Sequence, residues 1–260
     1  MPLHAIHSGG PDGAVPLVLL HGFGGTASDW MPVIHVLAGT VPVLAYDLPG
    51  HGGSLDAPEP GGAGRMARAV RLDLEARGLT RFHLCGHSLG GAVAAILALK
   101  APEIVESLTL LAPGGLGPAI NHRVLKRYAC PLDRGELRLA LEALRGFNAS
   151  VTREMVERVW EDRSRAGARA ALETVFDAMM RSGVGGRMEQ GTLAMVDLAR
   201  LPIPVSLAWG EQDGILPRPN EGELPGNTRY HCWPGVGHML IDEAPQAVAT
   251  LLADMVASRR

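Results

Sequence analysis

Three residue types that can together activate a hydroxyl nucleophile follow short apolar runs in this chain of 260 residues. Ser88 stands in the sequence Gly-His-Ser-Leu-Gly, between an apolar run at 82–85 and a helical pattern that begins near Gly91. A serine on a sharp turn between a strand and a helix projects its hydroxyl above the sheet, and flanking glycines let neighbouring backbones approach closely. We therefore predict that Ser88 is a nucleophile. The alternative is a chance match in a glycine-rich chain.

A serine hydroxyl is a poor nucleophile unless a base removes its proton, so the second candidate is a histidine. His238 follows the strand expected at 228–233 and precedes the last helix, on a loop that can reach over the sheet. Two other histidines compete with it. His231 should lie within the strand itself, and His87 lies in the serine turn with no room to face Ser88 as a base. His238 is the predicted base.

The third candidate is an acid that orients the histidine and stabilises its charged form. The apolar run at 205–209 is followed by Gly-Glu-Gln-Asp, so an acid there emerges at the same sheet edge as Ser88 and His238. Asp213 is our prediction, and Glu211 is the alternative.

The turn after the apolar run at 16–20, His-Gly-Phe-Gly-Gly, can direct a backbone N–H at a substrate oxygen. We predict that the N–H groups of Phe23 and Leu89 form an oxyanion hole. The turn lacks the G-x-G-x-x-G spacing and the lysine of nucleotide-binding loops. Asp47 and His51 occupy another polar turn, and two such residues are too few for a metal site. We expect neither a metal nor a cofactor.

The elements that must position these residues alternate along the chain. Continuous apolar runs predict buried strands at 16–20, 41–46, 82–85, 107–111 and 205–209, and helical patterns occupy 65–77, 91–100 and 244–257. This alternation predicts an α/β fold with a mainly parallel sheet flanked by helices. Residues 114–190 instead follow a helical period, which predicts a helical cap inserted between sheet strands and broken at the glycine-rich 182–186. The expected core comprises 1–113 and 191–260.

The composition restricts the class of partner. A formal net charge of -3 leaves no basic surplus for nucleic acid or an anionic membrane, so we expect a small-molecule substrate. The first residues lack a basic leader, and no apolar run is long enough to span a bilayer. Three scattered cysteines indicate reduced thiols. We therefore expect a cytoplasmic protein. The oligomeric state, including a homo-oligomer, is left open.

These motifs stand in the order found in the α/β-hydrolase superfamily, which the chain resembles along nearly its whole length. The resemblance rests on 21–24, 47–52, 86–91, 210–213 and 237–238. It implies the α/β-hydrolase sheet and maps the family's nucleophile, acid, base and oxyanion donors onto Ser88, Asp213, His238 and the N–H groups of Phe23 and Leu89.

The segment 111–121 is similar to two subgroups: hydrolases that cleave carbon–carbon bonds in ring-fission products, and the acyltransferase component of acetoin-cleaving systems. The first group usually has asparagine before the nucleophile and tryptophan after the base, where this chain has His87 and Met239. Members of the second often carry a lipoyl domain ahead of the hydrolase, whereas this sequence starts directly with the hydrolase.

We therefore expect a serine hydrolase that cleaves a small to medium carboxylic ester through an acyl-enzyme. Carbon–carbon cleavage or acyl transfer on the same triad is the first alternative, and a binding protein without activity is the second. No arginine can be directed into the pocket from the sequence alone, so we expect an apolar ester rather than a strongly anionic one. The expected pocket residues, some of which could instead pack the cap helices together, are Gly24, Trp160, Met179, Met180 and Met239.

Overall fold

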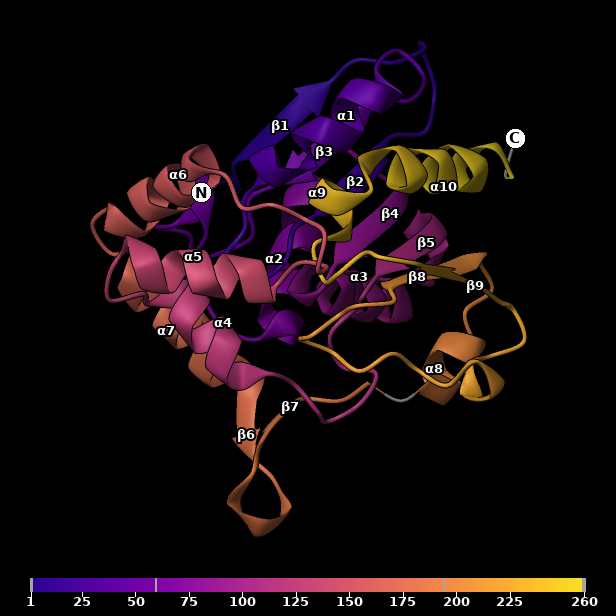
Figure 1. Cartoon of the computed structure of the whole chain (residues 1–260). Helices are drawn as coiled ribbons and strands as arrows, with labels where there is room; N and C mark the ends of the chain where they lie inside the picture. Colours follow the sequence, from indigo (N-terminus) through magenta and orange to yellow (C-terminus); the bar gives the residue numbers. More distant parts are fainter. Residues whose placement is uncertain (1, 59, 194, 259–260) are drawn as a thin grey trace.

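The protein is built around one seven-stranded sheet, seen in a computed structural model that describes residues 2–58, 60–193 and 195–258 (Figure 1). The strand order is β1-β3-β2-β4-β5-β8-β9; β1 pairs with β3 in the antiparallel sense and every other pair in this sheet is parallel. The strands are β1 (Ala5–Ser8), β2 (Leu17–Leu20), β3 (Val43–Tyr46), β4 (Phe82–His87), β5 (Val105–Leu111), β8 (Val205–Gly210) and β9 (Thr228–Trp233).

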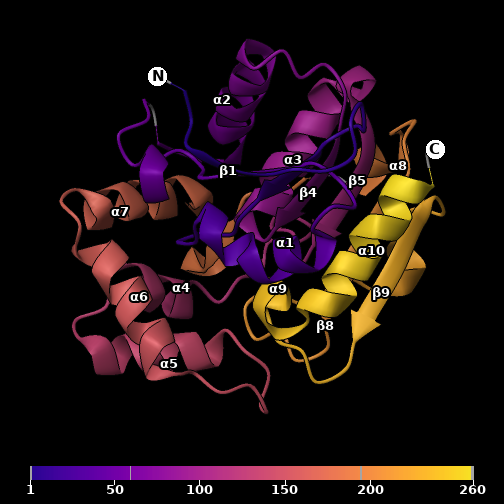
Figure 2. The same cartoon turned by 90° about the horizontal axis from the view of Figure 1, so that it is seen from above.

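Two layers of helix cover the faces of this sheet. Figure 2 shows α2 (Ala63–Ala76) and α3 (Leu89–Lys100) on one side of the sheet, in the upper part of the view, and α1 (Met31–Leu37), α9 (Leu240–Glu243) and α10 (Pro245–Ala257) on the other. The short α8 (Met195–Ala199) contacts α3. Because helices lie on both faces, the central strands are buried on both sides: every residue of β2, β3 and β4 is buried. The α/β class with a mainly parallel sheet is confirmed.

Between β5 and β8 the described chain forms four helices and a small hairpin, which the short α8 follows. The helices gather at one end of the molecule (Figures 1 and 2) and are α4 (His122–Ala129), α5 (Arg134–Ala143), α6 (Arg153–Ser164) and α7 (Ala168–Met179). The side chains of Asp133 and Thr152 cap α5 and α6 by accepting hydrogen bonds from backbone N–H groups in the first turn. The division of the chain into a core and a cap domain stays a prediction.

Two parts of the fold differ from the sequence-based expectation. The edge strand β1 was missed because its four residues are only partly buried and include polar His7 and Ser8. The glycine-rich stretch at 182–186 was expected to interrupt a helix, but α7 already ends at Met179. The stretch instead lies at the loop of a two-stranded antiparallel hairpin, β6 (Met180–Ser182) with β7 (Met188–Gln190).

The parallel strands bring their carboxyl ends to one edge of the sheet. The loops that follow β2, β4, β8 and β9 there carry Phe23, Ser88, Asp213 and His238. Ligands of open α/β sheets bind at this edge. Among the described residues, no helix is both long and apolar enough to cross a membrane.

Candidate active site

Ser88 lies in a sharp turn between β4 and α3, with a backbone that few non-glycine residues adopt. Its φ of 53° and ψ of -115° place it outside the usual regions, and its N–H donates to the Leu111 carbonyl at 2.9 Å. Side chains at the two flanking glycines would not fit: a Cβ on Gly86 would collide with the Gly90 carbonyl, and one on Gly90 with the His21 carbonyl. The glycines of the motif thus allow the close backbone approach that the sequence indicated.

Ser88, His238 and Asp213 form one continuous chain of hydrogen bonds. The Oγ of Ser88 lies 2.9 Å from Nε2 of His238, and Nδ1 of His238 lies 2.8 Å from Oδ2 of Asp213. An ionised carboxylate only accepts, so Nδ1 carries the imidazole proton and Nε2 accepts from the serine hydroxyl. This is the geometry in which a histidine can take a proton from serine as the oxygen attacks a carbonyl.

Three donors hold the Asp213 carboxylate. Its Oδ1 accepts from the N–H groups of Ile215 at 2.8 Å and Leu216 at 3.0 Å, while Oδ2 accepts from His238. Burial opposes ionisation, but the positive form of His238 and these hydrogen bonds outweigh it, so the pKa of Asp213 lies below its ordinary value. The carboxylate stays ionised. Among the described residues, the rival acid Glu211 forms no hydrogen bond or ion pair with His238.

The two competing histidines are not placed to serve Ser88. His87 is buried, and its Nε2–H donates to the backbone carbonyl of His238 at 2.7 Å. Burial, with a smaller contribution from His238, lowers the pKa of His87 to about 3, so its ring is neutral. His231 lies within β9, as expected.

The predicted oxyanion donors flank Ser88. Leu89 is the first residue of α3, where a backbone N–H has no partner within the helix and the helix dipole favours negative charge. In the described chain the N–H of Phe23 also has no hydrogen-bond partner, and Phe23 shares with Ser88, His238 and Met239 the lining of a small cavity of about 20 Å³.

The loop that carries Phe23 is held from both sides through Gly24. The N–H of Gly24 donates to Nε2 of His51 at 3.1 Å. Its carbonyl accepts from Nη2 of Arg163 at 2.6 Å and from the Tyr128 hydroxyl at 3.2 Å. Arg163 and Tyr128 come from α6 and α4, and both are buried. Helices inserted between β5 and β8 therefore fix the oxyanion loop.

The polar turn after β3 ties loops together through Asp47. Asp47 accepts from the N–H groups of Ala27 at 2.6 Å and Gly53 at 2.6 Å, and its Oδ2 lies 2.7 Å from Nδ1 of His4. Over the described ranges, no group of three or more His, Cys, Asp or Glu side chains could hold a metal ion.

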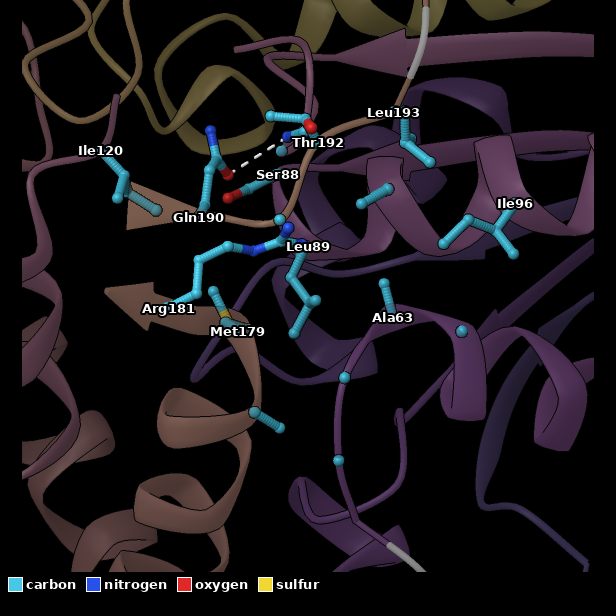
Figure 3. A pocket seen from close by; sticks show the side chains of 18 of the residues that line it. Ala63, Ser88, Leu89, Ile96, Ile120, Met179, Arg181, Gln190, Thr192 and Leu193 are labelled. Atoms are coloured by element: carbon cyan, nitrogen blue, oxygen red, sulfur yellow. Dashed lines mark hydrogen bonds between the residues drawn. The ribbon is translucent and has the colours of Figure 1, made fainter. Parts of the chain in front are cut away.

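A cavity of about 580 Å³ opens beside Ser88 (Figure 3). Its wall comes from the start of α2, from α3, from residues 114–120 and from the hairpin β6–β7 with the chain that follows it. Gln190 joins the last two parts: its Oε1 accepts from the N–H of Gly115 at 3.2 Å, the dashed line in Figure 3, and its Nε2 donates to the Gly117 carbonyl at 2.9 Å.

The five expected pocket residues lie in different places. Met179 lines the large cavity, and Met239 lines the small one beside the triad. Within the described part of the chain, Gly24, Trp160 and Met180 line neither. Gly24 is in the oxyanion loop, and the Trp160 ring packs under the guanidinium groups of Arg134 and Arg169. Met180 begins β6, and successive side chains of a strand point to opposite faces. Because the next residue, Arg181, lines the cavity, Met180 points to the other face.

Four site residues were not expected: Tyr128, Arg163, Arg181 and Gln190. The sequence does not indicate that Arg163 is buried, since α6 contains several arginines that cannot be told apart by their sequence context. Arg181 and Gln190 reach the cavity only because 180–190 forms a hairpin. A strand period in this short segment was the one signal that could have placed them.

Fold and site together define an α/β-fold hydrolase with a serine, a histidine and an aspartate in hydrogen-bond contact. The chain belongs to the alpha/beta hydrolase family, whose model matches residues 17–251.

Proteins similar to this chain are named for different reactions. The chain is 34% identical over 239 residues to the dihydrolipoyllysine-residue acetyltransferase component of the acetoin cleaving system of Pseudomonas putida, a match that covers 92% of this chain and 62% of that protein. It thus spans less than two thirds of that relative's length. It is 24% identical to monoacylglycerol lipase abhd6-B of Xenopus laevis, with 96% of this chain and 77% of the lipase covered. The structure of a 2-hydroxy-6-oxo-6-phenylhexa-2,4-dienoate hydrolase from Rhodococcus sp. strain RHA1 is similar with a TM-score of 0.82 at 25% identity, covering 98% and 94% of the two chains.

Proposed function

We propose that this protein is a serine hydrolase that cleaves a small to medium carboxylic ester through an acyl-enzyme. The observation that carries the proposal is the chain of hydrogen bonds from Ser88 through His238 to Asp213, at 2.9 and 2.8 Å, beside a cavity of about 580 Å³. That volume lies in the range of small-molecule sites.

In the proposed reaction, His238 takes the Ser88 proton as the oxygen attacks the ester carbonyl. The N–H groups of Phe23 and Leu89 stabilise the negative oxygen of the tetrahedral intermediate. His238 then donates its proton to the departing alkoxide, which leaves as an alcohol. Water, activated by His238, attacks the acyl-enzyme and releases the acid and free Ser88.

The test is the hydrolysis of p-nitrophenyl esters of increasing acyl length by the wild type, by Ser88→Ala and by the exposed control Ser150→Ala. We expect turnover by the wild type and the control and its loss in Ser88→Ala. Turnover that survives in Ser88→Ala would show that another group is the nucleophile. A vinylogous diketone assayed in parallel detects carbon–carbon cleavage.

Acyl transfer is the second candidate, and the sequence similarity to the acetyltransferase component favours it. In that case a thiolate replaces water in the second step and forms a thioester. Dihydrolipoamide added to the ester assay should then raise the release of p-nitrophenol and yield acyl-dihydrolipoamide. If the acid is the only acyl product at high thiol concentration, hydrolysis is the activity.

A further inference from the structure

The large cavity combines an apolar wall with two arginines that form no ion pair among the described residues. Leucine and isoleucine side chains form much of its surface, and the two charged residues that line it are Arg65 and Arg181. No aspartate or glutamate is among the described residues that line it, and neither arginine forms an ion pair within the described ranges. Within residues 2–58, 60–193 and 195–258, the cavity lining therefore carries two exposed cations without an ion-pair partner.

Arg181 lies directly opposite an acid but does not pair with it. Antiparallel β6 and β7 place Arg181 opposite Glu189, a position that favours a cross-strand ion pair. The Glu189 carboxylate instead packs against Gly183 near the hairpin loop, and Nη2 of Arg181 lies 2.6 Å from where a Cβ on Gly191 would be. Figure 3 shows the Arg181 side chain extending from β6 toward Leu89 and Ser88. The guanidinium is thus turned into the cavity.

Arg65 adds a second cation to the lining of the cavity, from α2 instead of the hairpin. It lies in the first turn of α2, where the helix dipole disfavours positive charge. The charge of Arg65 therefore does not stabilise this helix. Its side chain folds back over Gly61, which also lines the cavity.

We propose that the substrate carries an anionic oxygen group, a carboxylate or a phosphate, which Arg181 binds with the support of Arg65 while the apolar part occupies the cavity beside Ser88. The guanidinium fork matches either group through paired N–H donors. This inference rests on the proposed ester hydrolysis, names its substrate class, and replaces the uncharged ester expected from the sequence.

The test compares matched esters. Mono-p-nitrophenyl glutarate carries a carboxylate on its acyl chain, and its methyl ester is the neutral counterpart. 4-Butanoyloxyphenyl phosphate carries a phosphate on the alcohol side, with phenyl butanoate as its counterpart. Each pair is assayed with the wild type, with Arg181→Gln and with Arg187→Gln, an exposed arginine of the same hairpin that does not line the cavity.

We expect the wild type to prefer one anionic ester over its counterpart in kcat/KM. Arg181→Gln should reduce this preference by about tenfold or more, the effect of losing a charge-assisted hydrogen bond, and Arg187→Gln should leave it unchanged. The ester pair whose preference falls in Arg181→Gln shows whether the bound anion is a carboxylate or a phosphate. A preference that is absent in both pairs, or unchanged in Arg181→Gln, overturns the anionic subsite while Ser88-dependent hydrolysis stands.

If no ester is turned over, the proposed ester hydrolysis is refuted. A binding measurement then tests the anionic subsite separately. N-(4-nitrophenyl)glutaramic acid, an amide analogue of the glutarate ester, is titrated calorimetrically into the wild type and both variants. Weaker binding to Arg181→Gln alone supports the subsite. Equal binding to all three proteins, or none to the wild type, overturns it.

Discussion

The buried His87 predicts a defined loss of stability in acid. Its ring stays neutral in the folded protein because burial lowers its pKa to about 3 from 6.5. Below pH 6.5 the unfolded chain gains a proton at this position and the folded protein does not, so the free energy of unfolding falls with pH until about pH 3. Between pH 7.5 and pH 5.0 this difference in proton binding amounts to about 2 kcal/mol.

The perturbation is His87→Gln, which keeps a donor for the His238 carbonyl but cannot titrate. Urea unfolding, followed by tryptophan fluorescence at pH 7.5 and pH 5.0, gives the loss of stability for each protein. We expect the variant to lose about 2 kcal/mol less than the wild type over this interval. The exposed His35→Gln is the matched control and should behave as the wild type. An equal loss in His87→Gln and wild type would refute a neutral His87.

Two further predictions concern groups that support the triad. Asp213→Asn should lower kcat by about 10⁴-fold with the fold retained, because the amide donates to Nδ1 of His238 and leaves the proton on Nε2; ester kinetics with circular dichroism measure both, and a loss below tenfold would contradict the assigned tautomer. Arg163→Met should lower kcat roughly tenfold or more with little change in KM, because the carbonyl of Gly24 loses its charged donor and the oxyanion loop shifts. A higher KM at constant kcat would instead place Arg163 in substrate binding.

The sequence carried most of the information about the sheet and the triad. Strands buried on both faces are continuous apolar runs, so five of them were located to within two residues. The partly buried β9 was expected at 228–233 and agrees at both ends. Ser88, Asp213 and His238 each follow one of these six strands. Parallel pairing alone then brings them to one edge of the sheet, with no need to know how the helices pack.

The pocket wall could not be predicted in the same way. Whether Met179 or Met180 faces the cavity depends on where α7 ends and β6 begins, since the periods of the two elements direct neighbouring side chains differently. Trp160 looked like an apolar pocket residue, but two arginines from the helices before and after α6 pack on its ring. Such contacts arise from tertiary packing and leave no local pattern.

The bond between Arg163 and the Gly24 carbonyl makes the integrity of the proposed oxyanion hole depend on the position of α6. If this helix swings away from the sheet, the loop bearing Phe23 loses the charged donor that holds it, although Ser88, His238 and Asp213 remain in contact. The opened molecule would then be inactive: it could exchange substrate and product but could not stabilise a tetrahedral intermediate. Turnover would be confined to the closed form without any change in the triad.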